Sequence, residues 1–347
     1  MRISLKTVPG ISGYSNIGRY LARALALGGH EICWPTVFGI MSRPIDVTVH
    51  VTSPGYQRNP RRLNLAYTMF ETDRLPPGWA DALNRCDGVL IPSEWCRAAF
   101  LASGVTVPIH VVNHGVFTCD VPAPGPRARV IDPFCFLSVL QWTERKNPAA
   151  LLEAYWLEFA QDEPVSLVLK VSPWGIDDTI AAEIAAVRAR LGLRAYASLE
   201  VIRGDMHQAE VWELINSCHA YVSAHCAEGF GSPMLEAMAC GKPVIGTGYS
   251  GNLEFMNDTN SLLVDYTLGL VGEVRPALRQ FYSPNMTWAQ VSIPDLRCAM
   301  RLVYEGGALV QGMADNARLT VAERFTPQNT AAQFGAAIER IRSHATG

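Results

Sequence analysis

The 347-residue sequence contains no apolar run long enough to span a bilayer. It also lacks a strong excess of charge, since 29 Lys and Arg residues stand against 32 Asp and Glu residues, for a net charge of −3. We therefore expect neither a membrane-spanning protein nor a dedicated nucleic-acid binder. The opening stretch MRISLKTVPG predicts a strand and a turn rather than a secretion signal.

Several motifs of other chemistries are also absent. The sequence has no D-x-D, the acidic motif of many metal–diphosphate sites, and no H-E-x-x-H or G-x-S-x-G. Its nine cysteines are widely scattered and never form C-x-x-C, which favours reduced thiols over a disulfide framework. We therefore predict a cytoplasmic protein with no resident metal ion.

What the sequence does contain is two successive series of short apolar runs that alternate with amphipathic segments. This alternation predicts an α/β protein with parallel sheets and crossover helices. In the first series, strands are expected at 2–8, 30–34, 45–52, 63–70, 88–93 and 109–116, with helices from 16 to Gly28-Gly29, at 79–86 and at 94–104. In the second series, strands are expected at 134–140, 165–172, 198–204, 220–224 and 243–248, with helices at 149–161, 179–193, 209–218 and 233–241.

A proline-rich stretch separates the two series. Residues 120–133 hold four prolines, which neither a helix nor a central strand accommodates, so we expect a linker there. We predict an N-terminal domain over 1–125, a C-terminal domain over 126–325 and a last helical segment over 326–347. Residues 1–125 carry a net charge of +3 and the remainder −6. The first domain is therefore suited to an anionic acceptor or to the inner face of a membrane, although ordinary surface variation also explains this difference.

Two glutamates eight positions apart, Glu228 and Glu236, flank a loop that contains Gly229 and Gly231. The following Ser232-Pro233 predicts a helix that begins with the serine as its N-cap. Free N–H groups at a helix start suit a diphosphate, and the glycines let a ligand approach the backbone. Because a carboxylate beside an anion needs hydrogen-bond donors, we expect both glutamates to accept from sugar hydroxyls. Two glutamates alone also fit an ordinary helix start beside an unrelated loop carboxylate.

The whole string E-G-F-G-S-P-M-L-E-A-M-A-C-G-K-P-V-I, residues 228–245, closely resembles the E-x(7)-E motif of retaining GT-B glycosyltransferases, especially glycosyltransferase family four. Segments 67–105, 109–116 and 136–155 resemble further parts of that family in the right order, and the resemblance is weakest over 267–300. It implies two Rossmann-like parallel-sheet domains facing across a cleft, with the last helix returning to the first domain. It also implies transfer of a sugar from a nucleotide diphosphate-sugar to an acceptor hydroxyl, with retention at the anomeric carbon.

The resemblance assigns roles to individual residues. Glu228 is expected to contact the transferred sugar, Glu236 the ribose, and Arg145 with Lys146 the leaving diphosphate. Cations are also expected there on chemical grounds, because breaking the glycosidic bond leaves extra negative charge on the diphosphate that they stabilise. The other donor-binding positions are Gly13 in the loop after the first strand, and Gly229, Phe230, Gly231, Ser232, Met234 and Leu235 around the helix start.

The sequence departs from the family pattern at two places. Leu140 and Gln141 stand where the family often has an arginine, and Phe70 stands where many members have a histidine near the reacting sugar. Glu71 is expected to take the place of that histidine, because it follows a strand at the edge where open α/β sheets bind ligands. His50 is the alternative, although a histidine within an apolar strand is more often a core residue.

A second glycine motif, Gly246-x-Gly248-x-x-Gly251, matches the dinucleotide-binding fingerprint. We reject this interpretation because the turn-rich segment 252–261 follows in place of the required helix. In the resembled family this loop borders the donor sugar, so Gly251 and Asn252 are expected to contact it. We predict no cofactor beyond the donor substrate itself.

Some choices remain open from sequence alone. The donor is of the UDP or GDP type, and the acceptor is a saccharide or another small or lipid-linked molecule, but neither base, sugar nor acceptor is determined. A GT-B sugar-nucleotide epimerase, a phosphorylase and a non-catalytic nucleotide-sugar binding protein are the alternatives. A DNA-modifying transferase is disfavoured by the net charge.

Overall fold

The computed structural model describes residues 1–8, 10, 13–34, 44–56, 58–121, 133–172 and 179–346. The chain forms two compact units, Met1–Phe117 together with Glu323–Gly347, and Thr118–Ala322. The division therefore falls a few residues before each boundary expected from the sequence, at 125 and 325. Most of the expected linker, 120–133, lies outside the described residues, as do Pro9, Ile11 and Ser12 of the first loop.

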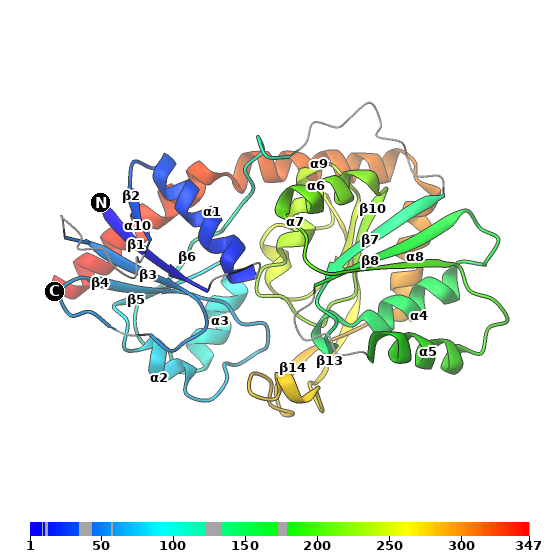
Figure 1. Cartoon of the computed structure of the whole chain (residues 1–347), viewed down its shortest axis with the longest axis horizontal. Helices are drawn as coiled ribbons and strands as arrows, with labels where there is room; N and C mark the ends of the chain where they lie inside the picture. Colours follow the sequence, from blue (N-terminus) through cyan, green and yellow to red (C-terminus); the bar gives the residue numbers. More distant parts are fainter. Residues whose placement is uncertain are drawn as a thin grey trace. The chain divides into compact units, whose positions relative to one another are not determined.

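The first unit is built on a six-stranded, wholly parallel sheet in the order β2-β1-β3-β4-β5-β6 (Figure 1). Within the described residues, helices connect several of these parallel strands, as the sequence pattern predicts. The strands are β1 (Arg2–Thr7), β2 (Glu31–Cys33), β3 (Val47–Val51), β4 (Leu63–Tyr67), β5 (Gly88–Ile91) and β6 (Ile109–Val111). The helices are α1 (Gly13–Leu27), α2 (Trp79–Leu83) and α3 (Glu94–Ala102).

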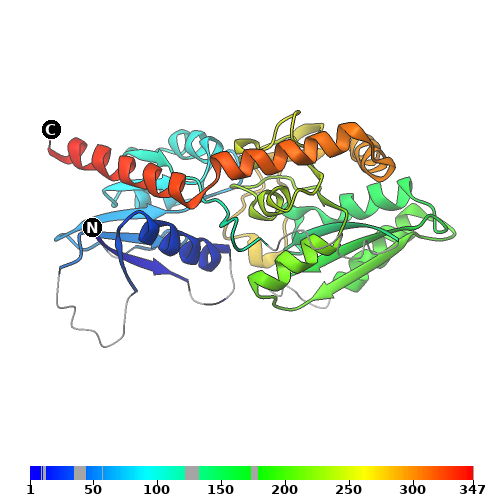
Figure 2. The ribbon, with the colours of Figure 1, turned by 90° about the horizontal axis from the view of Figure 1, so that it is seen from above.

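The last helix, α10 (Pro327–Thr346), belongs to this first unit and packs beside α1. Figure 2 shows it in red along the first unit. Its Phe334, Ile338 and Ile341 are almost completely buried in one apolar cluster with residues of α1 and of the strands. The Tyr20 hydroxyl of α1 also hydrogen-bonds the Thr330 hydroxyl at 3.0 Å. Burial of this apolar stripe holds the C-terminal segment on the first sheet.

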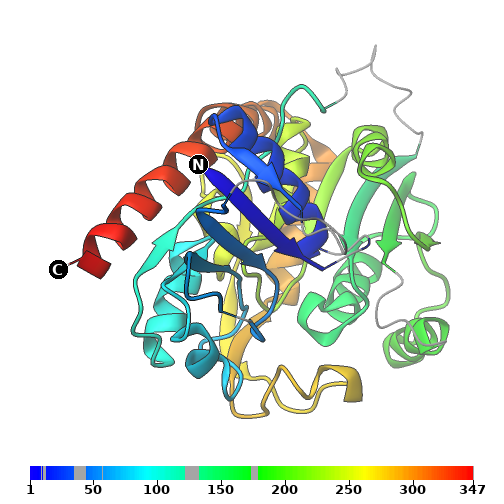
Figure 3. The same ribbon diagram turned by 60° about the vertical axis from the view of Figure 1, so that its left-hand side comes forward.

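The second unit contains another parallel six-stranded sheet, in the order β12-β11-β10-β7-β8-β9. Its strands are β7 (Phe134–Leu140), β8 (Val165–Val171), β9 (Ser198–Arg203), β10 (Ala220–Ser223), β11 (Val244–Thr247) and β12 (Leu262–Val264). Its helices are α4 (Pro148–Glu158), α5 (Thr179–Leu191), α6 (Gln208–Ser217), α7 (Ser232–Ala239), α8 (Ile293–Glu305) and α9 (Ala308–Arg324), with 3₁₀ turns η1 (Glu144–Lys146), η2 (Gly251–Glu254) and η3 (Pro276–Leu278). Figure 3 shows this unit from another side.

The structure differs from the expected elements in two ways. Strands β4 and β6 end several residues early, because buried residues such as Phe70 and Val112 follow the last paired residue without extending the sheet. The edge strand β12 and an antiparallel hairpin of β13 (Tyr266–Leu270) and β14 (Thr287–Val291) were not expected. Among the described residues, no helix combines the length and apolar character needed to cross a bilayer.

We predict that Gly115→Ala weakens the attachment of the C-terminal segment. A Cβ at residue 115 lies 1.9 Å from the Phe325 carbonyl oxygen, which accepts a 2.9 Å bond from the Val116 amide. Overpacking of this kind lowers the free energy of unfolding by about 1–3 kcal/mol or more. Urea denaturation of the whole chain measures the change.

The control for this substitution is Gly335→Ala within α10, where a Cβ meets nothing within 4 Å. We expect that change to raise the unfolding free energy by about 0.5–1 kcal/mol, as for other glycines in helix interiors. Equal stability of the two variants contradicts the proposed close approach at Phe325.

Candidate functional site

Arg145, Lys146 and Glu228 form a buried ion cluster in the second unit. Their loops follow β7 and β10, which are paired neighbours in the parallel sheet, so both loops emerge at the same edge. Arg145 Nη1 donates to Glu228 Oε2 at 3.0 Å, and Lys146 Nζ contacts Oε1 of the same carboxylate. The three side chains are only 10%, 12% and 7% exposed. The structure thus brings Glu228 against an Arg-Lys pair that lies more than 80 positions earlier in the chain.

The two cations determine the charge of this cluster. Burial by itself raises the pKa of Glu228, but Lys146 and Arg145 outweigh it and hold that pKa at about 2. The carboxylate is therefore ionised at neutral pH, and the cluster keeps an excess of one positive charge. A buried positive excess with fixed donors is suited to binding an anion.

The backbone around Glu228 is held by the loop after β11. The Glu228 amide donates to Ser250 Oγ at 2.7 Å, and the Gly251 amide donates to the Glu228 carbonyl at 2.8 Å. Ser250 adopts a φ of 79°, which is rare for a residue other than glycine. A Cβ on Gly251 lies 2.2 Å from the Gly229 carbonyl oxygen, so only glycine allows this approach. The third glycine of the rejected dinucleotide motif therefore has a packing role.

His225 is a neutral structural residue that the sequence analysis did not identify. It is fully buried, and burial lowers its pKa to about 4. Asn252 donates from Nδ2 to the Thr247 carbonyl, so its Oδ1 accepts from His225 Nε2 at 3.1 Å. The other ring nitrogen, Nδ1, then accepts from the Ser223 hydroxyl at 3.0 Å. The only sequence signal was a histidine three residues before Glu228.

Asn252 is itself completely buried, and its side chain is occupied by these bonds to His225 and Thr247. The sequence analysis expected Asn252 to contact a donor sugar. In the structure its side chain connects the loops that follow β10 and β11, and contact with a donor sugar stays a prediction.

The helix start differs from the prediction by one residue. Helix α7 begins at Ser232, and its N-cap is Gly231 with a left-handed φ of 96°. Pro233 consequently occupies the second helical position. A Cβ at Gly231 lies 2.5 Å from Met234 Cε, which gives glycine a second reason to stand there. The Phe230 ring is buried edge-on against Phe255, with centroids 5.1 Å apart, and anchors the loop.

Glu236, in the first turns of α7, is half-buried and accepts a 3.1 Å hydrogen bond from Gln208 Nε2 at the start of α6. Burial raises the pKa of Glu236 to about 7. Glu228 and Glu236 therefore differ strongly, because only Glu228 has cationic partners. Gln208 was not predicted, since nothing in the sequence joins it to a glutamate 28 positions later.

The remaining predicted residues, Gly13, Glu71 and His50, belong to the first unit. Gly13 is the first residue of α1, and a Cβ there meets nothing within 4 Å. Glu71 is half-buried after β4, beside the buried Phe70. His50 lies within β3 and is 4% exposed, and burial, with Lys6 nearby, lowers its pKa to about 4. Its Nε2 has no hydrogen-bond partner among the described residues.

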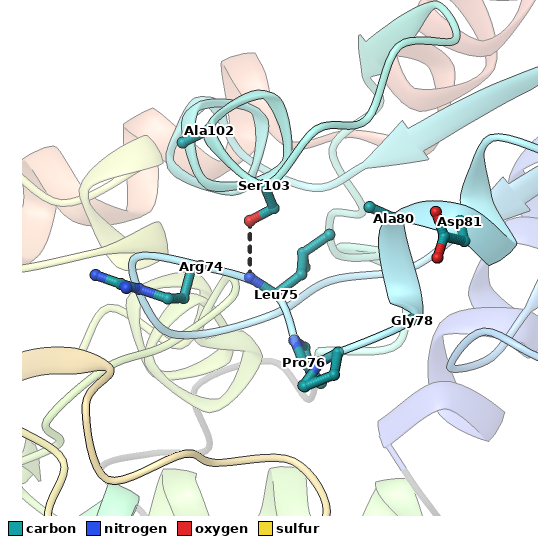
Figure 4. Close-up of a pocket in the computed structure, with 9 residues that line it drawn as sticks. Arg74, Leu75, Pro76, Gly78, Ala80, Asp81, Ala102 and Ser103 are labelled. Carbon is teal, nitrogen blue, oxygen red and sulfur yellow. Dashed lines mark hydrogen bonds between the residues drawn. The ribbon is translucent and has the colours of Figure 1, made fainter.

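A cavity of about 380 Å³ also lies in the first unit, near Arg74, Leu75 and Ser103 (Figure 4). The Leu75 amide donates to Ser103 Oγ at 2.8 Å, and Arg74 is paired with Asp73. The cavity contains none of the predicted site residues. Within the described ranges, no group of three or more His, Cys, Asp or Glu residues is arranged to hold a metal ion.

A family model and several known proteins resemble parts of this chain. The family model described as glycosyl transferases group 1 matches residues 193–267, which include the loop and helix start around Glu228 and Glu236. The serotype-specific mannosyltransferase WbdA of Escherichia coli is 32% identical over 160 residues, which cover 45% of this chain and 18% of that protein. The chain therefore spans less than a fifth of the length of the curated relatives it matches.

Solved structures resemble almost the whole chain. Anabaena Alr3699/HepE in complex with UDP and glucose has a TM-score of 0.71 at 16% identity, covering 98% of this chain and 99% of that one. Sucrose-phosphate synthase from Thermosynechococcus elongatus has a TM-score of 0.72 at 16% identity, with 99% and 100% coverage. WaaG, a glycosyltransferase involved in lipopolysaccharide biosynthesis, has a TM-score of 0.64 at 15% identity, with 97% and 98% coverage. These likenesses and the two parallel sheets confirm the predicted GT-B fold.

We predict that Gly251→Ala displaces the Glu228 loop, because its Cβ overlaps the Gly229 carbonyl oxygen. The unfolding free energy should fall by about 2 kcal/mol or more, as for other overpacked positions. The matched control is Gly248→Ala in the same glycine motif, where the nearest atom, the Val264 carbonyl oxygen, is 3.4 Å from the new Cβ. Equal destabilisation of both variants in chemical denaturation would count against the close approach.

We also predict that Glu236→Gln stabilises the free protein at pH 8. The folded pKa of about 7 exceeds the ordinary value of 4.5, so the folded state keeps a proton that the unfolded chain has lost between these values. Stability therefore falls as pH rises through that window and stays lower above it. Removing the charge should raise the free energy of unfolding by on the order of 1–3 kcal/mol at pH 8 and should change it little at pH 5.

Thermal melts of both proteins at pH 5 and pH 8 measure this difference. Glu213→Gln on α6 is the control, because that side chain is exposed. Parallel pH–stability curves for wild type and Glu236→Gln would refute the buried-carboxyl explanation. The range from pH 5 to pH 8 does not include protonation of Glu228, because that carboxylate loses its stabilising charge only as pH falls from about 4.5 towards 2.

Proposed function

We propose that this chain is a retaining glycosyltransferase that moves a sugar from a UDP- or GDP-type sugar to an acceptor hydroxyl without a resident metal ion. The observation that carries the proposal is the buried cluster of Arg145, Lys146 and Glu228 beside the start of α7. The family model that covers the same loop supports it, as does the name of the mannosyltransferase relatives.

The two cations suit a departing nucleoside diphosphate. When the bond between the anomeric carbon and the diphosphate oxygen breaks, negative charge accumulates on the diphosphate. Arg145 and Lys146 are already held in place, because the Arg145 carbonyl accepts a 2.7 Å bond from the Cys226 amide and Glu228 pairs with both side chains. Preorganised cations of this kind favour the charged transition state without further rearrangement.

The two glutamates are suited to hydroxyl recognition at two positions. Glu228 is ionised throughout the physiological range, so it only accepts hydrogen bonds and fits the hydroxyls of the transferred sugar. Glu236, once ionised, accepts from the ribose hydroxyls. Because its pKa is about 7 in the free protein, donor affinity should weaken as pH falls below 7. The Anabaena structural neighbour was solved with UDP and glucose, which supports a donor of this class.

Retention is supported by the weak nucleophilicity of Glu228. A carboxylate paired with two cations and with a pKa of about 2 is a poor nucleophile and a poor base. We therefore favour a same-face route in which the acceptor hydroxyl attacks as the diphosphate leaves. The new bond joins the acceptor oxygen to the anomeric carbon, and the acceptor proton passes to the departing phosphate oxygen.

For the acceptor side, we propose Glu71 rather than His50. Glu71 is half-buried at the C-terminal end of β4, whereas His50 is almost fully enclosed within the sheet. Gly13, at the start of α1, is proposed to leave room for the substrates. The acceptor is a saccharide or another small or lipid-linked molecule. A cytoplasmic location, with contact to the inner membrane face, is part of the proposal, and nine free cysteines support reducing surroundings.

The proposal predicts a specific pattern of binding and turnover. One nucleoside diphosphate among UDP, GDP and dTDP, and its sugars, should raise the melting temperature of the wild type. Glu228→Gln and Lys146→Met should each lower kcat for transfer about 10²–10³-fold, since each removes a charged group at the reacting phosphate or sugar. Arg190→Met, which breaks an exposed ion pair with Glu153 elsewhere in the second unit, should leave kcat within about twofold.

Product analysis with a labelled donor distinguishes the alternatives. A new glycoside with the donor's anomeric configuration supports the proposal, and an inverted product contradicts retention. An epimerised sugar nucleotide indicates an epimerase, and phosphate-dependent cleavage indicates a phosphorylase. Tight donor binding without turnover of any acceptor indicates a binding protein. Wild-type transfer by a folded Glu228→Gln variant would show that the ion cluster is not the reacting site.

A further inference from the structure

The β13–β14 hairpin, residues 266–291, is separate from the six-stranded sheet of the second unit. It appears in yellow and orange at the lower edge of Figures 1 and 3. We propose that this hairpin positions the donor site, and that Arg275 is a positioning residue that acts through Glu144 on Arg145 and Lys146. This inference rests on the proposed function of that site.

The first contact joins the hairpin to the loop after β7. The Arg275 amide donates to Glu144 Oε1 at 3.0 Å, and Arg275 Nε lies 3.2 and 3.1 Å from the two carboxylate oxygens. Glu144 opens the 3₁₀ turn η1, whose next two residues are Arg145 and Lys146. Holding the Glu144 carboxylate therefore orients the turn that presents both cations. The Arg275 side chain is 15% exposed and that of Glu144 is 32% exposed, so solvent screens this contact only in part.

The second contact joins the hairpin to the loop that carries Glu228. The Ala289 amide of β14 donates to the Cys226 carbonyl at 2.9 Å, and the Cys226 amide donates to the Arg145 carbonyl at 2.7 Å. Ala289 is completely buried. The hairpin thus holds both loops of the ion cluster, one through a side chain and the other through the backbone.

Arg275 also reaches a third group, Glu183 of α5, at 3.5 Å. The same carboxylate accepts from the indole of Trp142 and from the hydroxyl of Thr179, each at 2.8 Å. Trp142 is 1% exposed and precedes Glu144 by two residues. Arg275 therefore contacts two carboxylates that both hold the segment leading into Arg145.

The hairpin has its own apolar core, so its fold does not depend on Arg275. Val274, Leu278, Tyr282 and Met286 at the tip are all buried, and Tyr282 packs near the Trp288 ring of β14. Removing the Arg275 guanidinium should therefore remove its ion pair with Glu144, and leave only the bond from the Arg275 amide, without unfolding the hairpin. Arg279, one turn further, pairs with Glu273 in an ion pair whose side chains are 63% and 84% exposed, which makes it a matched control.

The test compares Arg275→Met with Arg279→Met in the full chain. Arg275→Met should lower kcat at least tenfold and weaken UDP or GDP binding, measured by calorimetry, about tenfold, with acceptor KM within twofold. Arg279→Met should remain within twofold of wild type in every quantity. Wild-type kcat and diphosphate affinity in folded Arg275→Met would overturn the proposal.

Two further variants separate positioning from a general loss of structure. Arg275→Lys, which keeps a cation beside Glu144, should recover part of the lost kcat. The double variant Glu144→Gln/Arg275→Met should be no worse than Arg275→Met, because both changes remove the same contact. Multiplicative losses in the double variant would contradict action through Glu144. If Arg275→Met does not fold, kcat and diphosphate affinity of Arg275→Lys and Glu144→Gln are compared with those of Arg279→Met instead.

The outcomes also separate this inference from the proposed function. An active wild type with an unaffected Arg275→Met variant overturns only the positioning role. A wild type that binds UDP or GDP without transfer contradicts the transferase proposal, while tenfold weaker binding by Arg275→Met still supports positioning of the cations. A wild type that binds neither diphosphate overturns both.

Discussion

Burial of the Glu228 carboxylate between Arg145 and Lys146 is the interaction on which the rest of the site depends. An isolated carboxylate in this position would be strongly disfavoured, since burial alone raises its pKa. Two cations reverse that effect, and they do so only if the loops after β7 and β10 stay in contact. Much of the surrounding structure therefore serves to keep these two loops together.

Uncharged groups, and one arginine that is itself ion-paired, provide that support. The neutral His225, the buried amide of Asn252 and the close approach of Gly251 fix the Glu228 loop without adding a charge. On the other side, Arg275 and Ala289 of the hairpin contact the segments before Arg145 and Glu228. Each of these supporting groups is either neutral near pH 7 or paired with an opposite charge. They therefore do not cancel the positive charge of the cluster, which can attract an anion.

Glu236 has electrostatic surroundings opposite to those of Glu228. It has a neutral partner, Gln208, and no cation, so its ionisation costs stability in the free protein. A group that destabilises the empty protein near neutral pH is expected where a ligand supplies the missing hydrogen-bond donors. The two glutamates of one motif thus have different electrostatic environments, which fits contact with two different sugars of one donor.

The alternation of apolar and amphipathic segments determined the two parallel sheets, because it is a local property that the chain carries along its length. The glycine-containing string around Glu228 also indicated the loop that the structure places against Arg145 and Lys146. Local pattern could not reveal the roles of His225, Gln208 and Arg275, whose partners lie far away in the chain. It likewise misplaced the helix cap by one residue, because the cap is Gly231 in a left-handed conformation that the local pattern does not determine. Tertiary structure alone decided which carboxylate is ionised, since burial and the distance to a cation set its pKa.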